Sequence, residues 1–449
     1  MFCRIEPAEK RWLLCVPIFF CIFLQTGCLD GPRSSGWLGI NTCLGEEELE
    51  GGVNHGLKDS HIRITYDLVG ELGVPLVRDS LMNWSRIQPT RDGVYDFAWS
   101  DAIVRQANKR RVDILALFDR IPPWAFVGMD VQAVRTRMPA RADADAFAVF
   151  VKRFVERYDG DGIGDMPGLR QSIGGYEFIN GIEDVRVEEY VWWLKLFYQT
   201  VKSADAKATV VLGSFTSPGL RRIDFGEGDY HTYFERLLSN PALQGADYPY
   251  FDVVGFHNYP DYYPGRSPFA DSLAYLGQTM ARHELNLPIW LTEYGSDKGD
   301  SNELRQANDI VRWAIEARSL GIERVYLHGL WDINRGGLES DRSGLVVRRR
   351  VGEVLHKKLG FGAFAMLLNE LADKPQLIRR GEGVYRLAGG NDSCLVVWKE
   401  ELYDPSAILV PGWWEVRTLT GRKYTRQGSA LKLTKMPLFL RKVRSPFIE

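Results

Sequence analysis

The sequence predicts an α/β protein, a (β/α)8 TIM barrel followed by a small C-terminal β-sandwich. Short apolar segments alternate with amphipathic helical segments through most of the 449-residue chain, a pattern that favours a parallel sheet with helical crossovers. No glycine-rich phosphate-binding loop follows the first apolar segment, which argues against an open nucleotide-binding sheet. From about Leu371 short strands separated by turns replace this alternation, as expected for a sandwich.

The barrel strands are expected where apolar runs are bounded by polar or turn-forming residues. In order they are Trp37–Leu44, Val74–Arg78, Val112–Phe118, Tyr176–Asn180, Ala208–Ser214, Phe251–Tyr259, Pro288–Tyr294 and Arg324–Asp332. Apolar residues at helical spacing between them predict helices at Asp59–Leu72, Asp101–Arg111, Asp143–Tyr158, from about Val187, and at Asp300–Leu320. Asp300 and Glu303 are placed to form a capping box at the start of the last of these helices.

The C-terminal part reads as short strands separated by turns. They are predicted at Val384–Leu387, Cys394–Trp398, Ala407–Val410, Trp413–Leu419 and Leu431–Thr434. The domain boundaries that follow are residues 1–28 for a signal peptide, 37–370 for the barrel and 371–449 for the β-sandwich.

The composition is that of a soluble globular body. Apolar residues make up 45% of the chain, enough for a large core, and charged residues make up an ordinary 25%. The formal net charge of −2 gives no reason to propose a nucleic-acid partner.

The N-terminus has the layout of an export signal. Basic residues at positions 4, 10 and 11 precede an apolar run, Trp12–Leu24, which is too short to span a bilayer comfortably. The segment Leu24–Cys28 resembles a bacterial lipobox, with Leu24 one position further from the cysteine than usual. Lipidation of Cys28 and plain secretion are both open. Either route places the body outside the cytoplasm, with membrane contact only through an N-terminal lipid.

Two cysteines, Cys43 and Cys394, lie beyond this leader. An exported protein can hold a disulfide between them. Two buried free thiols are the favoured expectation.

A carboxylate ends the apolar segment Pro288–Tyr294. Glu293 would point at the barrel mouth, because catalytic groups of such barrels lie at the carboxyl ends of the strands. Retaining glycoside hydrolysis requires two carboxyl groups about 5 Å apart, a nucleophile and an acid/base. Glu293 is therefore the candidate nucleophile, and a buried structural glutamate paired with arginine is the alternative.

Several segments, read together over residues 37–445, resemble clan A glycoside hydrolases of the family 39 and family 5 type. They are Arg78 at a strand exit, Trp84–Pro89 with Gly93–Phe97, Gly255–Tyr259, and Trp331. The resemblance implies that Arg78 orients the nucleophile and that His257 and Tyr259 lie near it. It also implies that Arg78, Asn180, His257, Tyr259 and Trp331 form the sugar-binding floor. An oligo- or polysaccharide would be the partner, and no cofactor would be required.

The fourth strand departs from this family pattern. Tyr176–Asn180 resembles the motif Trp-Glu-Ile-Trp-Asn-Glu-Pro, in which the glutamate after asparagine is the general acid/base, but Gly181 stands at that position. Glu177, three residues before Asn180, is expected to face the barrel wall or the interior bottom.

Three interpretations of Gly181 are open. In the first, Glu183 or Asp184 reaches in from the loop as a relocated acid. In the second, the acid is missing and the protein binds glycans without cleaving them. In the third, another group supplies the acid help, or the leaving group needs none. A pairing of Arg186 with Glu183 would hold that carboxyl ionised, the wrong state for a general acid. Glu183 and Asp184 can also serve only as favourable charges before the following helix.

An aspartate-rich loop precedes the fourth strand. Asp159, Asp161 and Asp165 alternate with glycines and resemble the calcium loops of thrombospondin type 3 repeats. Carboxylate oxygens at such spacing suit Ca²⁺. A structural calcium ion is one interpretation, and an acidic turn-rich loop is the favoured alternative.

The sequence as a whole predicts an exported glycoside hydrolase-like protein acting on β-linked glycans with retention. Glu293 is the nucleophile, and the acid/base is lost at Gly181 or relocated to Glu183. The alternative is a carbohydrate-binding pseudoenzyme of the cell envelope. Whether the protein turns over substrate is left open, and a purely structural lipoprotein ranks last.

Overall fold

The structure is a computed structural model of the chain. It describes residues 36–44, 59–126, 138–220, 232–262, 268–296, 302–334, 340–347, 355–372, 376–389, 392–399 and 408–444. The predicted signal peptide and Cys28 lie outside these residues, so export and lipidation stay predictions. Among the helices in the described ranges, none has the length and apolar character needed to cross a bilayer.

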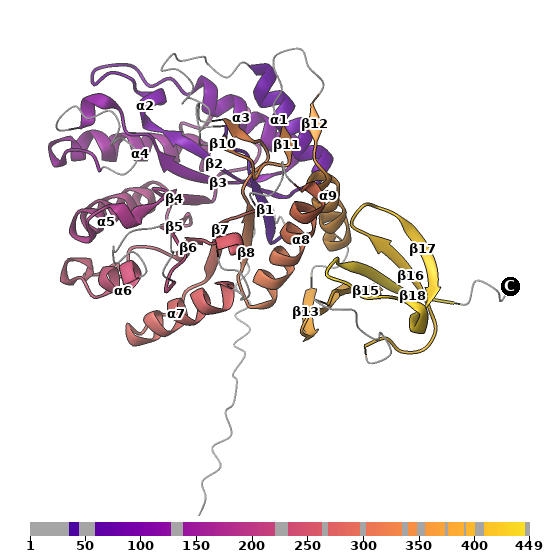
Figure 1. The fold of residues 1–449 in the computed structure, drawn as a ribbon. Coiled ribbons are helices and arrows are strands. Elements are labelled where there is room, and N and C mark those ends of the chain that lie inside the picture. The colour runs from indigo at the N-terminus through magenta and orange to yellow at the C-terminus, as the bar shows by residue number, and fades with distance from the viewer. Residues whose placement is uncertain are drawn as a thin grey trace, which may run out of the picture. The chain divides into compact units, whose positions relative to one another are not determined.

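Eight parallel strands close into a barrel in sequence order, with β8 pairing back onto β1 (Figure 1). The strands are β1 (Leu38–Asn41), β2 (Leu76–Asn83), β3 (Asp113–Asp119), β4 (Gly175–Phe178), β5 (Thr209–Thr216), β6 (Val253–His257), β7 (Ile289–Tyr294) and β8 (Arg324–Leu327). The barrel prediction is therefore confirmed. A layer of inward side chains fills the barrel: Leu76, Leu115, Val211, Val253, Trp290 and Tyr326.

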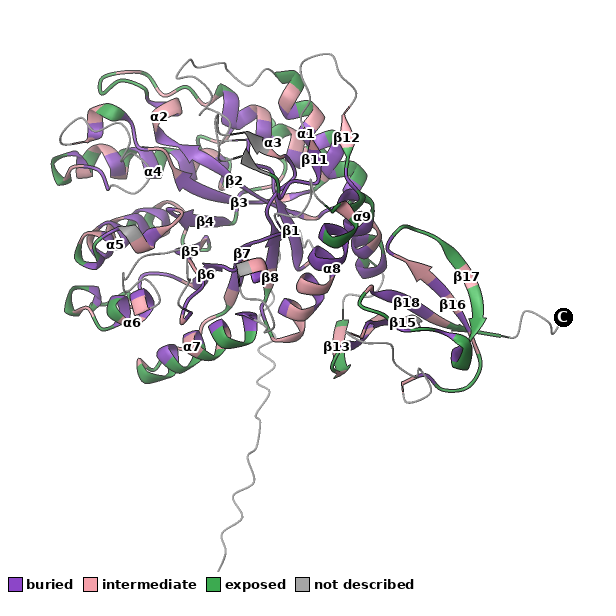
Figure 2. Cartoon of the chain, in the orientation of Figure 1, coloured by how far each residue is buried: buried purple, intermediate pink, exposed green. Residues whose placement is uncertain are grey.

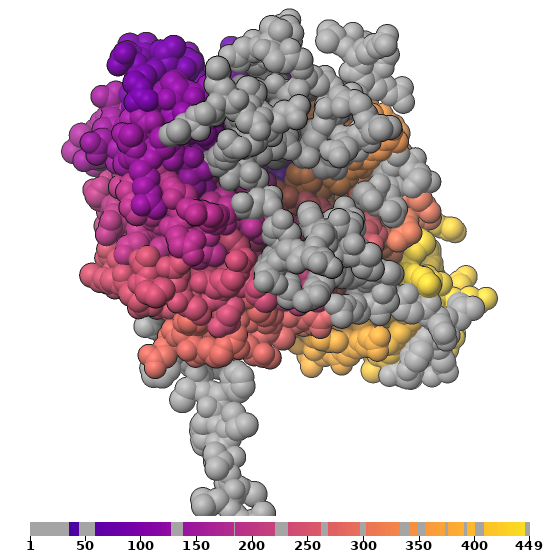
Figure 3. Space-filling view, turned by 60° about the vertical axis from the view of Figure 1, so that its left-hand side comes forward, coloured from indigo at the N-terminus to yellow at the C-terminus, as the bar shows by residue number. Residues whose placement is uncertain are grey.

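The helices cover the outside of the barrel and bury their apolar faces against it (Figure 2). They are α1 (Asp59–Leu72), α2 (Trp84–Ile87), α3 (Ala98–Arg110), α4 (Ala144–Tyr158), α5 (Val187–Ala204), α6 (Tyr233–Leu238), α7 (Pro268–Arg282), α8 (Glu303–Ser319) and α9 (Leu359–Ala372). In the space-filling view the colours run from indigo through magenta to orange down the visible face, as expected when consecutive β/α units lie side by side (Figure 3).

Aromatic side chains join α4 to the strands beneath it. Phe147 packs edge-on against Trp193 of α5 and against Phe118 of β3, and Phe178 of β4 stacks on Phe197 of α5. Each such ring buries a large apolar area, about 150–250 Å². This cluster fixes the outer sides of β3 and β4, the two strands whose ends matter most below.

Two helix details differ from expectation. The start of α8 is capped by Asn302, whose side chain accepts a hydrogen bond from the Arg305 amide at 2.9 Å. The predicted capping partner Asp300 lies outside the described residues. Helix α9 was not predicted, because Gly360 and Gly362 weaken its helical propensity; packing against α1 and α8 compensates.

The C-terminal β-sandwich prediction is confirmed as a six-stranded antiparallel sheet with both faces packed. Its strands, in the order of the sheet, are β13 (Gln376–Gly381), β14 (Val384–Gly389), β15 (Asp392–Val397), β18 (Leu438–Val443), β16 (Trp413–Thr418) and β17 (Lys423–Gln427). One face adds Tyr385, Leu387, Val396 and Phe439 to the core shared with the barrel helices. Glu370 of α9 also accepts hydrogen bonds from Arg417 and Arg441 of the sheet.

Two of the predicted C-terminal strands are wrong. Residues 408–410 form a turn, and Leu433 makes only an isolated bridge within 431–434. Leu409, Leu431 and Leu433 instead cover the second face of the sheet beside Trp414 and Leu440. Their apolar character reflects this covering role, whereas the Arg- and Lys-rich strands β13 and β17 were missed because they are largely exposed.

Four very short strands form hairpins beyond β8. They are β9 (Ile333–Asn334), β10 (Ser340–Asp341), β11 (Val346–Val347) and β12 (His356–Lys357). Both Cys43 and Cys394 are buried, and no disulfide joins them to each other, as favoured from the sequence.

Candidate active site at the carboxyl ends of the strands

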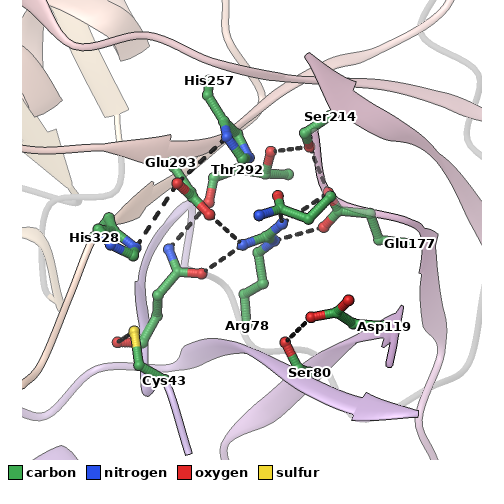
Figure 4. A network of polar contacts seen from close by, with 12 residues as sticks. Cys43, Arg78, Ser80, Asp119, Glu177, Ser214, His257, Thr292, Glu293 and His328 are labelled. Carbon is green, nitrogen blue, oxygen red and sulfur yellow. Dashed lines mark hydrogen bonds and ion pairs between the residues drawn. The ribbon is translucent and has the colours of Figure 1, made fainter. Parts of the chain in front are cut away.

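The guanidinium of Arg78 lies at the centre of a polar network inside the barrel mouth (Figure 4). Arg78 comes from β2 and is only 1% exposed. It donates to Glu177 through Nε (2.6 Å) and Nη2 (3.0 Å), to Asn180 through Nη2 (2.9 Å), and through Nη1 to Asn41 (2.9 Å) and Glu293 (2.8 Å). Side chains from four regions of the barrel are therefore held by one cation with fixed planar donor geometry.

Glu293, near the end of β7, is held from several sides. Its Oε1 accepts from Arg78, and its Oε2 accepts the phenol hydrogen of Tyr259 at 2.5 Å. Nδ1 of His257 lies 3.3 Å and Nδ1 of His328 3.8 Å from Oε2. The residue is 5% exposed. The predicted nucleophile and three of its predicted neighbours, Arg78, His257 and Tyr259, are thus brought together.

These contacts keep Glu293 ionised. Burial raises the pKa of its carboxyl, but the positive charges of His257 and His328 when these are protonated, the permanent charge of Arg78 and the Tyr259 hydrogen bond together lower it to about 2. Burial also lowers the pKa of His257 to about 3, against the attraction of Glu293. His257 is therefore neutral at pH 7, so at that pH the permanent charge beside Glu293 is Arg78. An ionised carboxylate is the form required of a nucleophile.

Glu177 of β4 is completely buried and forms a bidentate ion pair with Arg78. It also accepts a hydrogen bond from Ser214 of β5, whose hydroxyl lies 2.5 Å from that of Thr292 on β7. Its carboxylate is thus sealed inside the barrel within the Arg78 network, where it is not placed to donate a proton to substrate. Its role is to balance the buried charge of Arg78.

The end of β4 offers no side chain at the expected acid position. Gly181 has φ +69° and ψ 59°, and a Cβ placed there would meet no atom of the described residues within 4 Å. Its amide donates to the Ser214 carbonyl at 2.9 Å, which fixes this turn. Asn180 reaches Arg78, as the resemblance implied for the strand end. The space next to Asn180 is open where an acid side chain would stand.

Glu183 lies in a short 3-10 turn, Ile182–Asp184, directly after Gly181. Its Oε1 accepts the backbone amide of Thr216, the last residue of β5, at 3.1 Å. A hydrogen bond from an amide favours the ionised carboxylate, which is the wrong state for a general acid. The Asp184 side chain lies outside the described set. Arg186 is exposed and precedes α5 at the N-cap position, without a capping hydrogen bond from its side chain.

Trp331 lies away from this network. It is 2% exposed, its indole N–H donates to Thr65 of α1 at 3.0 Å, and its ring is 5.2 Å from that of His61. A sugar platform needs an accessible ring face, so the structure gives Trp331 a packing role, and its sugar-binding role stays an unsupported prediction. The residue that reaches Glu293 from the end of β8 is His328.

Other polar side chains of the mouth were missed from the sequence. Asn41 of β1 donates through Nδ2 to the carbonyls of Thr292 (3.1 Å) and Leu327 (3.3 Å), so that its Oδ1 faces Arg78. Asp119 ends β3 and is 21% exposed through its side chain. The available signal was the same for Asn41, Asp119 and His328: a polar residue directly at the end of an apolar strand.

The aspartate loop brings its three carboxylates together. Asp159, Asp161 and Asp165 offer oxygen atoms that lie within 4.8 Å of one another. Asp165 accepts the amides of Gly160 and Gly162 at 3.1 and 2.9 Å. Burial, and then the neighbouring negative charges, raise the pKa of Asp159 to about 6, against a backbone hydrogen bond from Asp161. The donor set of hard oxygens fits Ca²⁺.

Comparison with solved structures finds glycoside hydrolases with this fold. A family 39 glycoside hydrolase from Bacteroides cellulosilyticus WH2 matches with TM-score 0.63 and 17% identity, covering 92% of this chain and 81% of that one. A family 39 β-xylosidase from Caulobacter crescentus matches with TM-score 0.62 and 12% identity, covering 91% and 96%. A family 30 endoxylanase from Clostridium papyrosolvens C71 matches with TM-score 0.52 and 12% identity, covering 90% and 96%.

No protein-family model matches the chain, and no curated protein sequence does. At such low identities the structural likeness shows the fold. The chain therefore has the barrel-and-sandwich fold found in clan A glycoside hydrolases, as the sequence motifs indicated.

The buried neutral state of His257 predicts a loss of stability in acid. Below its ordinary pKa of 6.5 the unfolded chain takes up a proton on this histidine, whereas the folded protein does so only near pH 3. Stability is thus present above pH 6.5 and is lost as the pH falls, by up to roughly 1 kcal/mol per pH unit. The lowered pKa of Glu293 has the same effect: its contribution to stability is lost as the pH falls from its ordinary pKa of 4.5 to about 2.

The measurement is the free energy of unfolding in denaturant at pH 7, 6 and 5. We expect His257→Gln to flatten the pH dependence between pH 6.5 and 5, and His283→Gln, on the outer surface after α7, to keep the wild-type slope. An unchanged slope in His257→Gln would show that His257 is not held neutral.

Proposed function

We propose that the protein is a retaining glycoside hydrolase-like enzyme for β-linked glycans, with Glu293 as nucleophile. The observation that carries this proposal is the set of contacts from Arg78, Tyr259 and His257, which orient Glu293 at the barrel mouth, with Arg78 and Tyr259 also favouring its ionised form. A carboxylate so placed can attack an anomeric carbon and form a covalent glycosyl-enzyme. Side chains alone carry this chemistry, so no cofactor takes part.

The proposal includes the loss of the acid on β4. Gly181 has no proton to give, and Glu183 is tied to the amide of Thr216. Loss of general acid help typically slows the first step by ~10²–10⁴-fold. The enzyme therefore acts on glycosides whose leaving group departs without protonation. Relocation of the acid to Glu183 is the less favoured version, because its hydrogen bond stabilises the charged carboxylate.

The sugar-binding surface of the proposal consists of Arg78, Asn180, His257 and Tyr259. The solved structures with this fold include a β-xylosidase and an endoxylanase, which supports a β-linked oligo- or polysaccharide as the ligand. A carbohydrate-binding pseudoenzyme is the second candidate, and the observation that favours it is the open space at Gly181.

Export to the cell envelope completes the proposal. The basic and apolar N-terminal segment and the lipobox-like sequence ending at Cys28 support it. Mass spectrometry of the mature N-terminus tests this point: a chain that still begins at Met1 in the cytoplasmic fraction would overturn it.

Aryl β-glycosides with leaving groups of different acidity test the catalytic proposal. We expect Glu293-dependent release of acidic phenols such as 2,4-dinitrophenol, and rates that fall steeply as the leaving-group pKa rises, because no acid assists departure. Glu293→Ala should lose this release by at least ~10²-fold. Gly181→Glu should flatten the leaving-group dependence, since the site is open; its left-handed backbone costs roughly 1 kcal/mol for a side chain.

Three outcomes separate the candidates. A weak leaving-group dependence that becomes steep in Glu183→Gln places the acid on Glu183. Binding of β-linked oligosaccharides without release from any aryl glycoside makes the protein a pseudoenzyme. Release that is undiminished in Glu293→Ala removes Glu293 from the mechanism.

A structural calcium ion at Asp159, Asp161 and Asp165 is also proposed. Neutralising three neighbouring carboxylates would stabilise the loop that leads into β4. We expect 1 mM CaCl₂, but not MgCl₂, to raise the melting temperature of the EDTA-treated protein by a few degrees. A shift of this size is expected when an ion binds the folded state and not the unfolded chain. Asp161→Asn should abolish the shift. An equal melting temperature with and without calcium would remove the ion from the proposal.

A further inference from the structure

The second half of a retaining mechanism needs a base. Water must attack the glycosyl–Glu293 ester, and a carboxylate normally accepts the proton that this water loses. In the family pattern the residue at position 181 does this work, and glycine cannot. The inference below rests on the proposed function and concerns which residue of this chain takes the proton.

Asp119 occupies the end of the strand next to β4. Leu115 belongs to the inward layer of the barrel, and the two-residue alternation of a strand places Leu117 and Asp119 on the same inward side. Phe118 pairs in register with Phe178, so that Asp119 stands one residue beyond this pair, at the level where β4 runs towards Gly181. Figure 4 shows its carboxylate pointing to the interior beside Ser80, on the side of Arg78.

The contacts of Asp119 leave part of its carboxylate accessible. Its Oδ1 accepts the adjacent amide of Arg120 at 2.8 Å, and its Oδ2 lies 3.5 Å from Nε of Arg120 and 3.4 Å from the hydroxyl of Ser80. The two Oδ2 contacts are long for hydrogen bonds. A side chain that is 21% exposed, with one short contact and two long ones, can accept a hydrogen bond from a water molecule.

Three other carboxylates near the mouth are held differently. Glu177 is fully buried against Arg78 and Ser214. Asp79, 3% exposed, accepts from the Thr42 hydroxyl and from the Leu44 amide. Glu183 lies in the turn after Gly181, where its contact with the Thr216 amide directs its carboxylate towards the end of β5. Of these side chains, Asp119 combines an inward position with access to water.

We propose that Asp119 is the general base of the deglycosylation step. Water forms a bond from its oxygen to the anomeric carbon, the bond from that carbon to the Glu293 carboxylate oxygen breaks, and one water proton passes to Asp119 and then to solvent. The first step proceeds without an acid when the leaving group is good. The two roles of the residue at position 181 are therefore met separately. A good leaving group makes an acid unnecessary in the first step, and Asp119 acts as the base in the second.

Pre-steady-state kinetics of Asp119→Asn with 2,4-dinitrophenyl β-glycosides test this assignment. We expect a burst of about one equivalent of phenol per active site, at a rate within about threefold of wild type, followed by turnover slowed ~10²–10⁴-fold. The burst also shows that the variant is folded. Azide, which attacks without losing a proton, should raise the steady-state rate of Asp119→Asn at least tenfold and yield a glycosyl azide of retained configuration.

The matched control is Asp113→Asn at the opposite end of the same strand, which should behave as wild type in burst and turnover. Wild-type turnover in Asp119→Asn, or a slowed burst with no azide effect, overturns the assignment of Asp119 while leaving Glu293 in place. Absence of any Glu293-dependent phenol release from wild type overturns the proposed function itself, and with it the need for a base. The two failures are therefore distinguishable.

Discussion

The buried guanidinium of Arg78 is the interaction on which the rest of the site depends. Taking a cation out of water is costly, and the structure offsets this cost with two carboxylates and two amide oxygens at 2.6–3.0 Å. Because these acceptors come from β1, β4, β7 and the segment after β4, the charge ties together parts of the barrel that are distant in sequence. Removing any one acceptor would leave part of a buried cation unpaired.

This electrostatic arrangement separates the two carboxylates by role. Glu177 is sealed in the interior and balances Arg78, whereas Glu293 lies at the mouth, where Tyr259 and His257 complete its shell. The same field that keeps Glu293 ionised also opposes a protonated carboxyl beside it. The β7 carboxylate is therefore held as the proposed nucleophile requires, whereas the chain after β4 carries Gly181 beside open space. In the proposed function, such a site favours substrates that need little help to release their leaving group.

The scaffold explains how the polar mouth is held in place. Aromatic packing of α4 and α5 against Phe118 and Phe178 fixes the outer faces of β3 and β4. Just beyond these strands, Ile179 and Arg120 adopt positive φ angles of 68° and 63°, unusual for residues with side chains. These kinks redirect the chain where the strands end, and rigid packing beneath them supplies the stability that such conformations require.

The sequence by itself determined the barrel, the C-terminal β-domain and the candidates Arg78, His257, Tyr259 and Glu293, because strand alternation and a polar residue ending an apolar run are local patterns. The tertiary structure decided the partner of Glu177, the burial of Trp331 against α1 and the approach of His328 to Glu293. It also decided that Asp119 faces the interior. These facts depend on strand register and on single left-handed residues, which set the direction of a side chain without changing the hydrophobic pattern.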